Sequence, residues 1–195
     1  MKPTAPSLAG LSQKCKLTCA AAAAGLLFAV SGAQAQALTP KQESIIPIAA
    51  LTAEGDAARL KTVLADALNR KSMTVNEMKD VLLQMYAYTG FPRSLTGLGV
   101  LVNLLDERHT AGITDEKGRE ATPLHQEREL ATISALASLP APVQLRSHLN
   151  ASLNVGLSPK ALREFTEILR RDVGSTEAAL AQTTLDAVLA QRAAK

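Results

Sequence analysis

Residues 74–93 carry polar side chains whose types are suited to binding and deprotonating a small molecule. In a helix each residue turns by about 100 degrees, which gathers Val75, Met78, Val81, Leu82 and Met85 on one arc. The opposite face then carries Glu77, Asp80, Gln84 and Tyr88, and Arg93 follows after a short turn. We predict Asp80 or Glu77 as the base, Gln84 and Tyr88 as groups that orient the substrate, and Arg93 as the clamp for an anion. The alternative is that this stripe is only the solvated face of an amphipathic helix.

A histidine in the second half of the chain is a further candidate. His148 shares a helical segment with Leu145 and Leu149 and titrates nearest neutral pH, so we include it as a catalytic candidate facing the first half. The alternative is a hydrogen-bonded packing histidine. The sequence has no His pair with zinc-type spacing, no glycine-rich phosphate loop and no nucleophile elbow, so we predict neither a metal nor a cofactor.

The charge distribution excludes a nucleic-acid partner. Of the 195 residues, 47% are hydrophobic and 20% are charged, which is typical of a globular protein. Lys2, Lys14 and Lys16 precede the first acidic residue, Glu43, and the chain beyond residue 35 has 18 basic and 18 acidic residues. A balanced chain lacks the basic surface that phosphate binding requires.

Residues 1–35 resemble a secretory signal peptide. A basic start is followed by an apolar run over residues 19–30 and then by small residues, with cleavage expected after Ala35 or, alternatively, after Ala37. The run is shorter than the roughly 20 residues of a spanning helix, so we expect a periplasmic or secreted protein without a stable membrane anchor. Both cysteines, Cys15 and Cys19, lie in this leader, so the exported chain would contain no thiol.

Periodicity predicts an all-α fold with two related halves. Capping patterns and apolar stripes predict helices over residues 40–52, 56–69, 74–89 and 92–108. Similar segments return after 84 or 85 residues, as when Gln42-Glu43 recurs at Gln126-Glu127 and Gly90 at Gly174. We therefore predict a duplicated four-helix unit, with repeats over residues 38–110 and 124–195 joined by a linker over residues 111–123.

The segment Gln84-Met85-Tyr86-Ala87-Tyr88-Thr89-Gly90-Phe91-Pro92-Arg93-Ser94-Leu95, with the helix start before it, resembles the carboxymuconolactone decarboxylase family. This family includes alkylhydroperoxidase-like proteins, and the second half resembles tandem-repeat members at residues 128–133 and 144–157. The resemblance implies an all-α fold that assembles into homo-oligomers, trimers or hexamers, with the site near subunit contacts.

The resemblance implies two chemistries. The redox branch reduces peroxides with a Cys-x-x-Cys pair, which is missing where Thr89-Gly90-Phe91-Pro92 stand, so a thiol peroxidase activity is disfavoured. The decarboxylase branch needs only acid and base groups, so we predict decarboxylation or isomerisation of a small carboxylate or lactone. The second repeat lacks the polar set, so we expect one site per chain. The alternative is a non-catalytic binding or assembly module.

Overall fold

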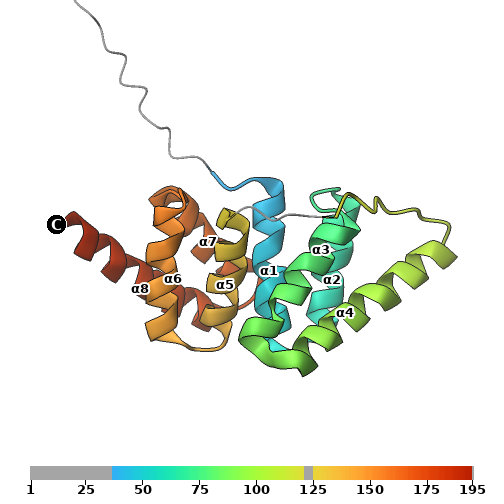
Figure 1. Cartoon of the computed structure of the whole chain (residues 1–195), viewed down its shortest axis with the longest axis horizontal. Coiled ribbons are helices and arrows are strands. Elements are labelled where there is room, and N and C mark those ends of the chain that lie inside the picture. Colours follow the sequence, from blue (N-terminus) through green and yellow to red (C-terminus); the bar gives the residue numbers. More distant parts are fainter. Residues whose placement is uncertain (1–36, 121–124, 195) are drawn as a thin grey trace, which may run out of the picture. The chain divides into compact units, whose positions relative to one another are not determined.

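The computed structural model describes residues 37–120 and 125–194, which form eight α-helices and no strand (Figure 1). The all-α prediction is therefore confirmed for this part of the chain. The proposed leader with its two cysteines and residues 121–123 of the proposed linker lie outside the described residues. The helices are α1 (Pro40–Glu54), α2 (Ala57–Asn69), α3 (Val75–Gln84), α4 (Tyr86–Thr110), α5 (His125–Ser138), α6 (Pro142–Asn154), α7 (Pro159–Asp172) and α8 (Ser175–Ala193).

Side-chain caps fix where α1 and α3 begin. Thr39 accepts a hydrogen bond from the Gln42 backbone, and the Gln42 side chain accepts one from the Thr39 backbone. Thr74 and Glu77 form the same reciprocal pair at α3. Each pair satisfies two backbone N–H groups that lack partners inside the helix. Both capping boxes that the sequence predicted are confirmed.

The boundary between α3 and α4 differs from the prediction of one helix over residues 74–89. α3 ends at Gln84 and α4 begins at Tyr86. The chain nevertheless keeps helical dihedral angles at Met85 (φ −60°, ψ −21°), and the first residue to leave them is Gly90 (φ 75°, ψ 168°). Glycine alone adopts such a conformation without strain. The helical backbone is therefore interrupted at Gly90, and a second helical run follows with Pro92 in its first turn, as the sequence predicted.

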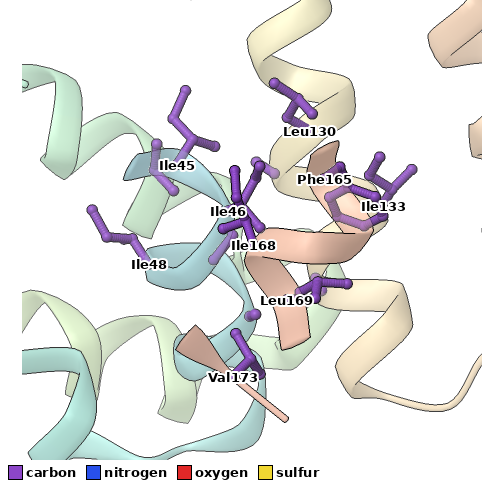
Figure 2. Packing of buried hydrophobic residues seen from close by; sticks show 14 of the residues in the cluster. Ile45, Ile46, Ile48, Leu130, Ile133, Phe165, Ile168, Leu169 and Val173 are labelled. Carbon is purple, nitrogen blue, oxygen red and sulfur yellow. The ribbon is translucent and has the colours of Figure 1, made fainter. Parts of the chain in front are cut away.

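α1 forms the centre of the core. All of its residues from 44 to 53 are buried, as expected for a helix that is apolar or small on every face. It packs against α2, α3 and α4 on one side and against α5 and α7 on the other (Figure 1). Figure 2 shows Ile46 of α1 on the side that faces apolar residues of α5 and α7, among them Leu130, Ile133, Phe165, Ile168 and Leu169, whereas Ile45 and Ile48 point to the other side of α1.

The helices of the second half follow the order of the first. α5, α6 and α7 begin 84 or 85 residues after α1, α2 and α3. Gln42 Nε2 donates a hydrogen bond of 3.4 Å to Gln126 Oε1, which lies 84 residues further along the chain. The duplication itself, and the domain boundaries drawn from it, stay predictions.

The segment after α4 fastens the start of α3. The backbone N–H groups of Val75 and Asn76 donate to the carbonyls of Glu116 and Lys117, each at 3.0 Å. Arg108, at the end of α4, holds Asp115 through two hydrogen bonds of 2.8 Å. The predicted linker therefore forms hydrogen bonds with the start of α3, the helix that carries the candidate residues.

Two further observations bear on what this protein could associate with. Several large apolar side chains around the α3–α4 junction are exposed, namely Leu83, Tyr86, Phe91 and Leu95. In the described ranges, no helix combines the length and the apolar character needed to cross a membrane. The expectation of a homo-oligomer stays a prediction.

Candidate functional site

The polar face of α3 packs against α5 instead of facing open solvent. Glu77, Asp80 and Gln84 are half-buried, while Met78, Val81 and Leu82 are buried in the core. The apolar arc that the sequence predicted is therefore confirmed at these positions. The opposite face is covered in part by α1 and α5, so the polar residues lie between helices.

A lysine from α1 ties the first part of this face together. Lys41 Nζ lies 2.8 Å from Glu77 Oε1 and 2.9 Å from Glu127 Oε1, and Glu127 is only 7% exposed. Asp80 and Gln84 line the same small cavity of about 10 Å³, which has room for about one water molecule. Glu77 and Asp80 thus share a space too small for an organic substrate, while Glu77 also borders a separate cavity of about 390 Å³ on the side of Thr74 and Arg108.

The charges in this cluster shift two pKa values. Burial alone would raise the pKa of Glu77, but hydrogen bonds from Lys41 and Thr74 and the charge of Lys41 bring it below its ordinary value. Burial alone would lower the pKa of Lys41, but its hydrogen bonds to Glu77 and Glu127 and their negative charges raise it. Glu77 is therefore held as a carboxylate, which makes it a poor proton acceptor at neutral pH.

This shift predicts how acid affects stability. Because the pKa of Glu77 is lower in the folded chain, its stabilising effect is present above the unfolded value, about 4.3, and is lost as the pH falls through the folded value. We expect the melting temperature to fall less steeply below about pH 5 in Glu77→Gln than in the wild type, as measured by calorimetry. Glu107→Gln, which removes an exposed partner of Lys61, should keep the wild-type slope. Equal slopes for Glu77→Gln and wild type would contradict the argument.

One turn further along, a hydroxyl links Gln84 to Tyr88. Gln84 Nε2 donates to the Arg128 carbonyl at 2.9 Å and to Thr132 Oγ1 at 3.2 Å. Thr132 Oγ1 also lies 2.9 Å from the Arg128 carbonyl and 2.9 Å from Tyr88 Oη. A threonine hydroxyl has one proton, so when it donates to the carbonyl, the Tyr88 hydroxyl donates to Thr132. Gln84 and Tyr88 are thereby fixed against α5.

Tyr88 in turn contacts the candidate histidine. The rings of Tyr88 and His148 meet edge to face, with centroids 6.3 Å apart and an interplanar angle of 87°. His148 Nδ1 lies 3.0 Å from Glu129 Oε2, and the side chains of His148 and Glu129 are 34% and 18% exposed. A carboxylate at Nδ1 favours the tautomer with its proton there, which leaves Nε2 as a proton acceptor. An imidazole exposed to this degree is within reach of a small solute.

Arg93 does not join these residues. Its guanidinium donates to the carbonyl of Ala53 near the end of α1, and its Nε lies beside Gly55. The kink at Gly90 directs the following turn of α4 toward the end of α1, away from α5. The structure thus brings Gln84, Tyr88 and His148 together, places Glu77 and Asp80 in the neighbouring lysine cluster, and gives Arg93 a structural contact.

Sequence reasoning missed Lys41, Glu127, Glu129 and Thr132 as members of the site. All four lie on α1 and α5, whose patterns indicated only capping and burial, and no spacing connects Glu129 with His148, 19 residues away. No group of three or more His, Cys, Asp or Glu side chains in residues 37–120 and 125–194 is placed to hold a metal ion.

Comparison with known proteins identifies a family that part of this chain resembles. The sequence model of the carboxymuconolactone decarboxylase family matches residues 19–103, a range that begins inside the proposed leader and ends within α4. It includes Glu77, Asp80, Gln84, Tyr88 and Arg93 but stops before the second half that supplies His148. A search of curated proteins gave no match. Over residues 19–103, the chain is therefore similar to the carboxymuconolactone decarboxylase family.

Proposed function

We propose that this protein is exported and carries out acid–base chemistry, decarboxylation or isomerisation, on a small carboxylate or lactone without a cofactor. The observation that supports this most strongly is the half-exposed His148 imidazole, oriented by Glu129 and packed against Tyr88. A carboxylate–histidine pair is a common form of general base. A thiol peroxidase activity is not proposed, because both cysteines lie in the expected leader.

His148 is the base in this proposal, in place of Asp80 or Glu77. In an isomerisation, Nε2 takes a proton from a carbon next to a carbonyl and returns it to another carbon. In a decarboxylation, the bond to the carboxylate carbon breaks, CO₂ leaves, and the electron pair is delocalised into the lactone carbonyl. Protonated His148 then supplies a proton to the carbon, and water restores it to the imidazole. Glu129 stabilises the imidazolium, which forms during the isomerisation and is the initial proton donor in the decarboxylation.

In this proposal Arg128 is the anion clamp, the role that the sequence analysis predicted for Arg93. The cluster around Lys41 has one positive group and three carboxylates, and its negative charge repels an anion. The carboxylates are those of Glu77, Asp80 and Glu127. Within the described residues, Arg119 and Arg128 are the arginines whose side chains make neither a hydrogen bond nor an ion pair. Arg128 is exposed, precedes Glu129, and lies one helical turn before Thr132. It is therefore the available cation nearest to the His148 pair along α5.

Ligand-induced stabilisation tests this proposal. A panel of carboxymuconolactone, muconolactone, muconate and their methyl esters is added to the protein and the melting temperature is recorded. A carboxylate at a hundredfold excess over its Kd stabilises by about 2.7 kcal/mol, or about 5 to 10 °C for a chain of this size. Arg128→Gln should weaken carboxylate binding about 10- to 100-fold and leave ester binding unchanged.

Arg119→Gln is the matched control, because it removes the other arginine without a side-chain partner. Shifts that are equal in Arg128→Gln and wild type would remove Arg128 from the site. The absence of any shift across the panel would favour the second function, a non-catalytic module that retains the fold.

A further inference from the structure

The N-terminal end of the described chain makes one long-range contact. The backbone nitrogen of Leu38 donates a hydrogen bond of 2.9 Å to Glu164 Oε2 on α7, 126 residues away. The Leu38 side chain is 6% exposed and belongs to the hydrophobic core, while Ala37 is exposed. Leu38 is therefore packed into the described fold two residues before α1 begins.

The two expected cleavage positions differ in what they place at this nitrogen. Cleavage after Ala35 leaves an amide at Leu38, which donates one neutral hydrogen bond to Glu164. Cleavage after Ala37 turns the same nitrogen into an α-ammonium with a positive charge and three donors. A bond between two charged groups is stronger than one between a neutral amide and a carboxylate.

The surroundings have room for the additional protons. A cavity of about 250 Å³ borders Leu38, and its lining combines apolar residues such as Leu157 and Ala161 with the oxygen-bearing side chains of Thr39, Gln42, Gln126, Glu127 and Ser158. An ammonium at this position therefore borders a cavity that contains polar side chains and is not surrounded by apolar groups alone.

We infer that the exported protein begins at Leu38 and that its α-ammonium forms an ion pair with Glu164, which locks the N-terminus onto α7. This inference rests on the proposed export. In the precursor the same carboxylate accepts a hydrogen bond from the neutral Leu38 amide, so processing adds a positive charge to an existing contact.

The full chain, produced in a bacterium that exports it, tests this inference by intact mass spectrometry of the periplasmic form. We expect a mass that starts at Leu38. Ala37→Leu places a large residue before the second cut and should move the N-terminus to Gln36, whereas Ala33→Leu affects only the first cut and should keep Leu38. Retention of Met1 would count against export itself, and a wild-type N-terminus at Gln36 would overturn only this inference.

Thermal melting of the same periplasmic proteins tests the ion pair. Glu164→Gln should lower the melting temperature by about 5 °C in the chain that begins at Leu38 and clearly less in the Ala37→Leu background. Glu167→Gln, an exposed change on the same helix, should have the same small effect in both. Equal losses from Glu164→Gln in the two backgrounds would overturn the pairing.

Discussion

Replacement of His148 by Asn should lower kcat about 10²- to 10⁴-fold, the usual contribution of a general acid–base group. Asn keeps an amide N–H near the position of Nδ1, so the contact with Glu129 survives while the proton acceptor at Nε2 is lost. The measurement is CO₂ release, or proton exchange in D₂O, with carboxymuconolactone or whichever panel compound is turned over. The melting temperature should stay close to that of the wild type, since the imidazole is half-exposed.

His109→Asn is the matched control for this substitution. His109 is exposed in the last turn of α4, far along the chain from the candidate site, and its loss should leave kcat unchanged. Turnover by His148→Asn at the wild-type rate would show that another group moves the proton, and the proposed mechanism would then be wrong.

The largest effect on stability is expected from Phe165→Ala. Phe165 of α7 is fully buried, and Figure 2 shows it beside Ile133 of α5. Truncation of a buried Phe to Ala removes apolar surface and leaves a cavity, which costs about 3 to 5 kcal/mol. We expect a fall in melting temperature of about 10 °C, together with a matching loss in the free energy of unfolding measured with urea.

Val143→Ala provides the comparison, because this side chain is 73% exposed. An exposed apolar truncation changes the free energy of unfolding by less than about 0.5 kcal/mol. A loss of similar size for the two substitutions would mean that α7 does not pack on α1 and α5 as described.

Local interactions explain which parts of the fold the sequence predicted well. The starts of α1 and α3 depend on contacts between residues three positions apart, Thr39 with Gln42 and Thr74 with Glu77. The buried arc of α3 depends only on helical periodicity. The interruption at Gly90 also follows from local signals, because glycine favours the end of a helical run and Pro92 suits the first turn of the next.

The candidate site was predicted only in part, for a different reason. Periodicity placed Glu77, Asp80, Gln84 and Tyr88 on one face, but it carries no information about which helix covers that face. Arg93 follows the same motif directly in sequence, yet the kink at Gly90 turns it toward Ala53. A short separation along the chain does not imply contact once the backbone changes direction.

The sequence by itself determined the helical composition, the capped starts of α1 and α3, and the polar character of the α3 face, because these follow from interactions within one or two helical turns. Only the tertiary structure decided that Lys41 neutralises Glu77 and that His148 meets Tyr88 and Glu129. Those contacts join residues from separate helices, and the packing of α1 and α5 around the shared core sets their distances.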